Sequence, residues 1–292
     1  MTSDRRDLHS AKILVTGARG QLGSDVCKVL CARHVENRGV GRKDFDIADA
    51  EAARAYIKEY RPDAVIHCAA WTAVDEAEDE PDKVLAVNAF GTRNIAAACK
   101  EIGAKMLYIS TDYVFPGTGE RPYEPDDPAD PLNAYGKSKF AGEQAVREIL
   151  DRYFIVRISW IFGKSGDNFV KTMLRLSQTR RELAVVCDQV GSPTYTADLA
   201  LLLCDMVMTE KYGIYHAGNE GFCTRAAFAE EIFRRSGRDV LVHPIPTSEY
   251  PTKAARPLNS RMSKEKIAQM GFSRLPSWQD ALERYLREIG EI

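Results

Sequence analysis

The chain has 292 residues, of which 45% are hydrophobic and 28% are charged, with a formal net charge of −2. These values are typical of a globular protein with one large or two moderate domains. They argue against a nucleic-acid partner or an anionic membrane surface. The sequence contains no run of about 18 apolar residues, so no membrane span is predicted.

The first part of the chain alternates strands with helices. Residues 1–10 lack the apolar core of a secretion signal and are expected to form a disordered tail. Residues 12–17 (KILVTG) predict a strand that ends in glycine, and a helical pattern follows from Leu22 to Arg33. The alternation continues with a weak strand at 38–41, a helix at 49–60, a strand at 64–70, a helix at 81–102 and a strand at 105–111. This order predicts right-handed crossovers and a parallel sheet.

A long loop separates this part from the rest. Residues 115–133 contain several prolines and acids, and we expect such a loop to border a site. After it come a predicted helix at 134–151, a strand at 153–159, and a looser series of short strands and helices that ends in a helix at 277–289. The expected fold is α/β: a Rossmann-like, doubly wound parallel sheet over residues 11–160 with a return of roughly 185–218, and a smaller C-terminal α/β substrate domain, mainly residues 161–292.

The seven cysteines are scattered singly, mostly inside apolar runs. The nearest pair, Cys27 and Cys31, has no matching second pair, so the pattern predicts buried thiols instead of a zinc site or disulfides. Such thiols indicate a reducing compartment. Together with the missing signal core, they predict a cytoplasmic protein.

Three glycines, Gly17, Gly20 and Gly23, lie between the first strand and the first helix in the sequence GARGQLG. Glycine lets the backbone approach a pyrophosphate closely, and the helix N-terminus favours the anion. The spacing is GxxGxxG and not GxGxxG, and glycine triplets also serve ordinary tight turns. The position of the triplet in the first strand–helix unit favours a dinucleotide site.

The segment GVGRKDFDI, residues 39–47, ends the second strand, where the preference between NAD and NADP is normally set. Arg42 and Lys43 favour NADPH because a basic side chain accepts the 2′-phosphate, whereas Asp44 and Asp46 favour NADH. An ordinary charged loop is the alternative for each residue. We therefore expect NADPH and leave NADH open.

Tyr135 and Lys139 in the sequence YGKSK are four residues apart, so on a helix they share one face with Cβ atoms about 5–6 Å apart. Lys137 points elsewhere. A nearby ammonium stabilises a phenolate and lowers the tyrosine pKa from about 10, which suits proton transfer near neutrality. The pattern predicts a catalytic pair, although YxxxK also occurs on ordinary helices.

Ser110 and Thr111 lie at the carboxyl end of a predicted parallel strand, where open α/β sheets bind their ligands. A hydroxyl there can donate a hydrogen bond to a substrate carbonyl oxygen. Ser-Thr-Asp also caps helices and forms turns. The order of the motifs behind a dinucleotide turn favours the catalytic interpretation.

Narrower motifs run through the chain: CAAWTAVDEAE, VNAFGTRNIA, ISTDYVFPG, NAYGKSKFAGE, RISWIFG, DQVGSPTYTADLA and ARPLNSRM. With ILVTGARGQLG, they resemble the dTDP-4-dehydrorhamnose reductase family of the extended short-chain dehydrogenase/reductase superfamily over nearly the whole length. The glycine turn and YxxxK are shared by the superfamily. The combination with TAVDEAE, STDYVF and DQxGSPTYTxDLA is much more specific.

This resemblance implies an NAD(P)H-dependent reductase of a sugar C4 carbonyl with Thr111, Tyr135 and Lys139 as its catalytic set. The substrate implied is a dTDP-linked 4-keto sugar, dTDP-4-dehydro-6-deoxy-L-mannose, which would become dTDP-L-rhamnose for cell-surface polysaccharide. The resemblance implies a cofactor site of Gly17, Gly20, Gln21, Leu22, Gly23, Arg42, Asp46, Ile47, Ala70, Trp71, Thr72, Asn88, Tyr135 and Lys139.

On the substrate side, the resemblance implies that Thr111, Asp112 and Trp160 hold the sugar nucleotide and that Asn168 and Arg256 bind its diphosphate. Trp160 as a core residue and Arg256 as a loop ion pair are the alternatives. Some relatives are described as using magnesium at a subunit contact, and a homodimer is compatible with the family. No residue set in this sequence compels a metal, so no ligands are assigned, and the acids at 75–80 are expected to favour a helix N-terminus.

Two other functions stay open. A superfamily epimerase or dehydratase would share the dinucleotide turn, but dehydration needs an acidic pair directly after Ser-Thr-Asp, where this chain has Tyr113 and Val114. A cofactor-binding regulatory subunit, like the related β subunit of methionine adenosyltransferase, has no need of Thr111, Tyr135 and Lys139. Their presence favours the reductase.

Overall fold

A six-stranded parallel sheet forms the centre of the computed structural model, which describes residues 11–292; the tail expected at 1–10 lies outside the described residues. The strand order is β10–β5–β4–β3–β1–β2. The strands are β1 (Lys12–Thr16), β2 (Glu36–Val40), β3 (Ala64–His67), β4 (Lys105–Thr111), β5 (Tyr153–Ile158) and β10 (Gly213–His216). The predicted Rossmann-like, doubly wound α/β fold is confirmed.

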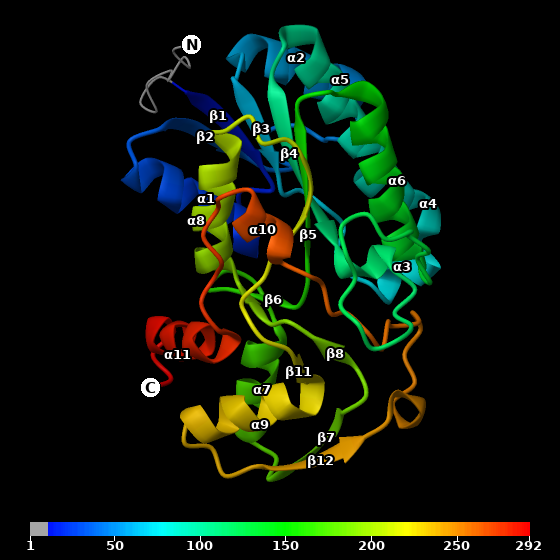
Figure 1. Ribbon diagram of the computed structural model, residues 1–292, viewed down its shortest axis with the longest axis vertical. Helices are drawn as coiled ribbons and strands as arrows, with labels where there is room; N and C mark the ends of the chain where they lie inside the picture. The colour runs from blue at the N-terminus through cyan, green and yellow to red at the C-terminus, as the bar shows by residue number, and fades with distance from the viewer. Residues whose placement is uncertain (1–10) are drawn as a thin grey trace.

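Helices cover both faces of this sheet (Figure 1). On one face, α1 (Gln21–Ala32) packs against α8 (Thr196–Val207); on the other lie α2 (Ala50–Tyr60), α5 (Thr92–Ile102) and α6 (Ala134–Ile149). Both faces are therefore buried, and the strands read as apolar runs for that reason. In β1, Ile13 and Val15 join one hydrophobic core while Leu14 joins the other.

The strand order reverses at β1, which lies between β2 and β3. A crevice opens at such a point in a doubly wound sheet, outside the carboxyl ends of the strands. The turn from β1 into α1 lies there. Gly17 has a φ of +67° in this turn, a conformation that residues with a Cβ rarely adopt.

The helix predicted at 81–102 is confirmed, but its winding changes in the middle. The structure has α3 (Glu76–Asp79), α4 (Pro81–Leu85), a π-helical segment η2 (Ala86–Gly91) and then α5. The extra residue of a π turn displaces the chain locally, and such turns are frequent at functional sites. The Thr92 hydroxyl donates to the Asn88 carbonyl over 2.7 Å within this segment.

The second, smaller body contains α7 (Phe169–Ser177), β7 (Glu182–Val186), α9 (Arg225–Arg235), β12 (Leu241–Ile245) and α11 (Trp278–Glu288), with β7 and β12 paired in parallel. Figure 1 shows it below the large sheet. Its short elements are β6 (Ile161–Phe162), β8 (Val190–Gly191), β9 (Thr194–Tyr195), β11 (Cys223–Thr224) and the 3-10 turn η4 (Thr247–Glu249). The 3-10 turn η3 (Asp112–Val114) packs against α6 and α10 (Glu265–Gln269) packs against β10, so both belong to the large body. Of the return to the large sheet predicted at 185–218, only α8 and β10 join the large body. Within the same range, β8 pairs with β11 and β9 pairs with β6, outside the large sheet.

The proline-rich loop at 115–133 is fixed to the end of the sheet. Arg157 of β5 donates to the Pro125 carbonyl over 3.0 Å and forms a buried ion pair with Glu143 of α6 over 2.8 Å. His216 of β10 contacts the Tyr123 carbonyl over 3.1 Å. Thus a loop without regular structure is held by buried charged and polar side chains of three elements.

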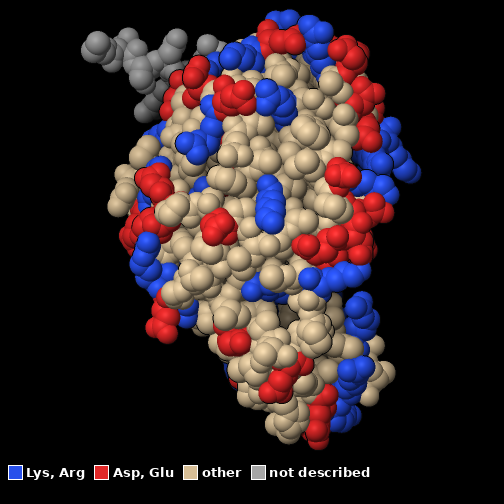
Figure 2. Space-filling view, turned by 90° about the vertical axis from the view of Figure 1, so that its right-hand side faces the viewer, with Lys and Arg blue, Asp and Glu red and all other residues tan. Residues whose placement is uncertain are grey.

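Both signs of charge are scattered over the surface that carries α3 to α6, with uncharged residues between them (Figure 2). Such mixing agrees with the small net charge of the chain. Within residues 11–292, no helix combines the length and the apolar character needed to cross a bilayer.

Candidate active site

One cavity of about 660 Å³ joins the glycine turn to the Tyr–Lys face. The carboxyl ends of β1, β3, β4 and β5 contribute to it, with α6 on one side and the segment after β5 on the other. Of the predicted site residues, it is lined by Gly17, Gly20, Gln21, Leu22, Gly23, Arg42, Asp46, Ile47, Ala70, Trp71, Thr72, Thr111, Asp112, Tyr135, Lys139, Trp160 and Asn168. Asn88 and Arg256 do not line it.

The glycine turn leaves the N-terminus of α1 open to the cavity. No side chain caps this helix and no acid lies in its first turn, so its free N–H groups and its dipole face the cavity unopposed. A Cβ on Gly23 would lie 2.3 Å from the Gly17 oxygen, and one on Gly17 would lie 2.7 Å from the Ala69 nitrogen. The turn is thus packed as tightly as backbone allows, which fits the pyrophosphate of a dinucleotide.

At the end of β2 the acids and bases differ in availability. Asp44 accepts a hydrogen bond from the Gly41 nitrogen over 2.8 Å, and Asp46 accepts one from the Ala48 nitrogen over 3.0 Å. The Arg42 side chain is 87% exposed and only 3.7 Å from Asp46. The Arg42 side chain is therefore open to a ligand, although it is ion-paired with Asp46.

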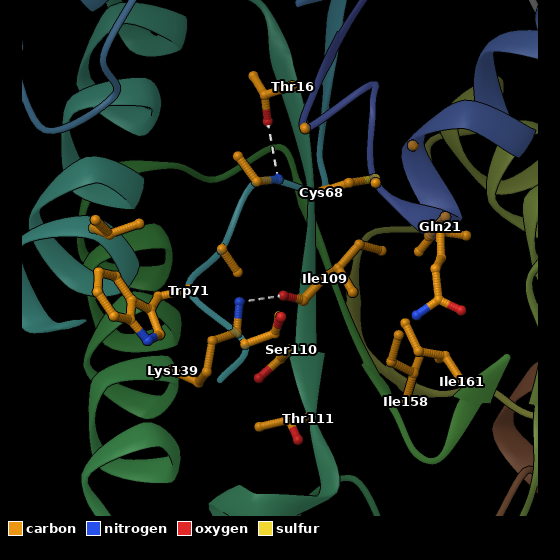
Figure 3. A pocket seen from close by; sticks show the side chains of 18 of the residues that line it. Thr16, Gln21, Cys68, Trp71, Ile109, Ser110, Thr111, Lys139, Ile158 and Ile161 are labelled. Atoms are coloured by element: carbon orange, nitrogen blue, oxygen red, sulfur yellow. Dashed lines mark hydrogen bonds between the residues drawn. The ribbon is translucent and has the colours of Figure 1, made fainter. Parts of the chain in front are cut away.

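Lys139 projects from α6 toward β4 (Figure 3). Its Nζ donates to the Ile109 carbonyl over 2.6 Å and lies 4.1 Å from the ring centroid of Tyr108. The residue is 2% exposed, and burial lowers the pKa of its ammonium to about 7, with Glu143 acting in the opposite direction. A second charged or polar partner in the cavity would restore the protonated form.

The pKa of the Tyr135 phenol is raised, whereas the sequence predicted that Lys139 would lower it. Burial raises the pKa of its phenol well above the ordinary value, and a hydrogen bond from Thr111 only partly opposes this. Desolvation of the buried phenol outweighs the other influences on this pKa, and the Lys139 ammonium is directed to the Ile109 carbonyl. The phenol is consequently held in its protonated form, ready to donate.

The start of α6 fixes Tyr135 in this place. The Asn133 side chain accepts a hydrogen bond from the Gly136 nitrogen over 2.8 Å and so caps the helix. A Cβ on Gly136 would lie 2.3 Å from the Tyr113 oxygen, so the helix approaches η3 by backbone contact. The rings of Tyr113 and Tyr135 meet edge to face at 5.7 Å.

Asn88 lies behind the cavity wall and is 1% exposed. Its side chain accepts from the Trp71 nitrogen over 2.8 Å and donates to the Trp71 oxygen over 3.0 Å and to the Ser138 hydroxyl over 3.0 Å. It therefore positions the segment after β3 from behind the cavity wall. The buried Trp71 indole nitrogen has no hydrogen-bond partner among the described residues.

Asp112 is a buried carboxyl in the cavity wall, 3% exposed. Thr111 donates to its Oδ1 over 3.1 Å, whereas its Oδ2 has no hydrogen-bond partner within residues 11–292. Burial raises the pKa of this carboxyl to about 6, and hydrogen bonds from Ser260 and Thr111 and the charge of Arg225 oppose the rise. Oδ2 is therefore available to accept a hydrogen bond from a ligand hydroxyl.

Trp160, Asn168 and Arg256 have different environments on the substrate side. Trp160 has a φ of +48°, which is unusual for a residue with a Cβ and typical of constrained functional positions.

The Asn168 amide connects the two bodies, since it donates to Gln21 Oε1 over 3.2 Å and to the Gly163 carbonyl over 2.9 Å. Arg256 forms a two-pronged ion pair with Asp75 over 3.0 and 2.8 Å. This ion pair is the alternative expected from the sequence, and it directs Arg256 away from the cavity lining.

Two further differences concern the rest of the site. The loop at 115–133, expected to border the site, contributes no lining residue. Arg225 lines the cavity, but no motif or spacing in the sequence connects it to the other site residues. Across residues 11–292, no group of three or more His, Cys, Asp or Glu side chains is arranged to hold a metal ion.

Known proteins are similar to this chain in sequence and in fold. The family described as RmlD substrate binding domain matches residues 11–290. The dTDP-4-dehydrorhamnose reductase of Streptomyces griseus is 45% identical over 276 residues, which cover 92% of this chain and 91% of that protein. The spore coat polysaccharide biosynthesis protein SpsK of Bacillus subtilis (strain 168) is 43% identical over 277 residues, 95% of this chain and 97% of that one.

A solved structure agrees closely. The crystal structure of the dTDP-4-dehydrorhamnose reductase of Bacillus anthracis str. Ames in complex with NADP has a TM-score of 0.93 and 44% identity, covering 95% of this chain and 99% of that chain. The resemblance predicted from the motifs is thereby confirmed. This chain belongs to the RmlD family, the family of the dTDP-4-dehydrorhamnose reductases.

Proposed function

We propose that this protein reduces the C4 keto group of a nucleotide-linked deoxyhexose with NADPH, converting dTDP-4-dehydro-6-deoxy-L-mannose to dTDP-L-rhamnose. The observation that supports this function most directly is the single cavity that contains both the open α1 N-terminus and Thr111, Tyr135 and Lys139. The names of the relatives give the sugar nucleotide. We place the reaction in the cytoplasm because all seven cysteines are free thiols.

NADPH is the coenzyme that the residues fit. The relative from Bacillus anthracis binds NADP, and the exposed Arg42 suits a 2′-phosphate. Gly17, Gly20 and Gly23 would face the pyrophosphate, and Ile47 and Asp46 would border the adenine end. NADH remains a second coenzyme of the proposal, since a 2′-hydroxyl would lose only the contact with Arg42.

The chemistry needs a proton donor beside the carbonyl oxygen. When bound, the reduced nicotinamide supplies the hydride. Tyr135 holds its proton because its pKa is raised, and gives it to the C4 oxygen as that oxygen gains charge. With substrate bound, the Thr111 hydroxyl turns its one proton from Asp112 Oδ1 to the same oxygen, and the Lys139 ammonium stabilises the phenolate that remains.

A coenzyme oxidation assay with a substrate panel tests this function. The purified protein would be mixed with NADPH or NADH and with dTDP-, GDP- or UDP-linked 4-keto sugars, while absorbance of the reduced nicotinamide is followed. A reductase oxidises one coenzyme per sugar, fastest with the dTDP-linked substrate. Conversion of a sugar nucleotide without net coenzyme oxidation would instead indicate an epimerase or dehydratase.

Arg42→Ala is expected to weaken NADPH binding about tenfold, as expected for loss of one charge-assisted contact, and to change NADH binding little. Dissociation constants for both coenzymes check this. Lys43→Ala is the matched control, because Lys43 does not line the cavity. Equal losses for NADPH and NADH in Arg42→Ala would refute a role at the 2′-phosphate.

Gly23→Ala is expected to lower the free energy of unfolding by about 1–3 kcal/mol, the usual range for overpacking, and to abolish measurable NADPH binding. The cause is the 2.3 Å approach of a Cβ to the Gly17 oxygen. Gly20→Ala separates the two effects, since its Cβ would lie 3.3 Å from the same oxygen. It should keep more stability yet still bind NADPH poorly; wild-type binding in both variants would contradict the assignment of this turn.

A further inference from the structure

Arg225 is the basic residue of the cavity that the proposed reaction leaves without a role. Three basic side chains line the cavity: Arg42, Lys139 and Arg225. Arg42 lies at the end of β2 and Lys139 is buried beside β4, whereas Arg225 begins α9 in the smaller body. It is therefore the one lining cation that the smaller body contributes among the described residues.

The Arg225 guanidinium is held by rings and not by acids. Its Cζ lies 3.6 Å from the ring centroid of Trp160 and 5.3 Å from that of Phe169. Within residues 11–292 it makes no hydrogen bond or ion pair, although Asp112 is near enough to interact with it electrostatically. A guanidinium has five N–H donors in one plane, and stacking leaves them free at its edge.

Trp160 is itself fixed against the backbone. A Cβ on Gly191 would lie 2.7 Å from Cε2 of the Trp160 ring, so β8 contacts the ring closely. The Trp160 indole thus contacts the Arg225 guanidinium on its face and β8 on another side. Its geometry suits a support for the guanidinium better than a stacking partner for a nucleobase.

The N-terminus of α9 adds to the positive electrostatic potential that Arg225 creates at this end of the cavity. Arg225 is the first residue of this 11-residue helix, whose N-cap Thr224 accepts a hydrogen bond from the Ala227 nitrogen over 3.0 Å. The helix dipole and the guanidinium thus both favour an anion at this end of the cavity. Arg256, by contrast, has its charge neutralised by both oxygens of Asp75.

We propose that Arg225, supported on the face of Trp160, binds the diphosphate of the nucleotide-sugar substrate. This role rests on the proposed function, which supplies the diphosphate. It replaces the sequence-based assignment of the diphosphate to Arg256, and it makes Trp160 a positioning residue that acts through Arg225. A guanidinium edge can engage two phosphate oxygens at once, which fixes the substrate in register with Tyr135.

Calorimetric binding of dTDP and of thymidine to the full-length protein tests the proposal without needing turnover. Arg225→Met should weaken dTDP binding about 10- to 100-fold, the equivalent of one or two charge-assisted hydrogen bonds, and leave thymidine binding unchanged. Arg225→Lys should recover part of the loss, since it keeps the charge but not the fork. Arg234→Met on the same helix, with a side chain 67% exposed, is the matched control and should bind dTDP as the wild type does.

Four more variants separate the contributions of Trp160, Arg225 and Arg256 to dTDP binding. Trp160→Leu should lower dTDP affinity as Arg225→Met does, Trp160→Phe should restore most of it, and the double variant Trp160→Leu, Arg225→Met should lose no more than either alone. Arg256→Met should weaken dTDP less than Arg225→Met. In steady state, Arg225→Met should raise KM for the sugar nucleotide while the KM for NADPH stays constant.

Three results would overturn the proposal: wild-type dTDP affinity in folded Arg225→Met, equal losses for dTDP and thymidine, or a wild type that does not prefer dTDP to thymidine. Thermal unfolding of each variant establishes that it is folded. A wild type that binds dTDP through Arg225 but oxidises no coenzyme with any 4-keto sugar would refute the reductase function and leave the diphosphate site intact.

Discussion

Tyr135→Phe is expected to lower the rate of carbonyl reduction by about 10²- to 10⁴-fold, the range that a positioned general acid contributes. The variant loses only the phenolic oxygen, and its ring keeps the edge contact with Tyr113. NADPH affinity should therefore stay near that of the wild type. Turnover is measured from absorbance of the reduced nicotinamide, and coenzyme affinity from a separate titration.

The neighbouring phenol provides the comparison for this variant. Tyr113 also lines the cavity, and burial raises the pKa of its phenol as it does for Tyr135. Tyr113→Phe should reduce the rate far less, because Tyr113 lies on η3 and not on the helix that carries Lys139. Comparable losses in both variants, or wild-type turnover in Tyr135→Phe, would mean that the proton comes from elsewhere.

Lys139→Met is expected to lower the rate about 100-fold or more and to raise the NADPH dissociation constant, because the cation beside the phenolate and the coenzyme is lost. Lys137→Met should change neither, since Lys137 is exposed on another side of α6 and does not line the cavity. Steady-state kinetics with both substrates measure the two effects. The reverse ranking would place the wrong lysine beside Tyr135.

The pH dependence of stability gives an independent check on Lys139. In the folded protein the pKa of this ammonium is lowered from 10.5 to about 7. The unfolded chain therefore binds more protons than the folded one between these values, and wild-type stability rises with pH across this window because of this group. Replacement by methionine removes that slope, so the coenzyme-free variant should gain more stability at about pH 6 than at about pH 10. A pH-independent difference in unfolding free energy would show that the ammonium is not desolvated.

Local periodicity accounts for the parts of the site that the sequence predicted. Tyr135 and Lys139 were paired by the helical repeat, and Thr111 and the glycines were placed by the ends of parallel strands. These signals depend on a few neighbouring residues, and burial on both faces of the sheet preserves them. The π-helical segment at 86–91 has no such signal, because one extra residue per turn depends on contacts such as that between Asn88 and Trp71.

Contacts between residues far apart in the sequence explain the features of the site that the sequence did not predict. Arg256 meets an acid 181 positions earlier in the chain, and this pairing removes it from the cavity. Arg225 reaches Trp160 only because α9 packs beside the segment that follows β5. The pKa of Tyr135 depends on the burial of the whole site, which outweighs the single charge one helical turn away. None of these three effects has a counterpart in sequence spacing.

The central claim is that Tyr135 delivers a proton to a sugar carbonyl as hydride arrives from a coenzyme bound at the glycine turn. Isotope transfer tests it most directly: the protein is supplied with NADPH deuterated at both C4 positions of the nicotinamide and with dTDP-4-dehydro-6-deoxy-L-mannose, and the product is analysed by mass spectrometry and NMR. We predict one deuterium at C4 of the sugar for each coenzyme oxidised. A product with hydrogen at C4, or a sugar that changes without coenzyme oxidation, would contradict this mechanism.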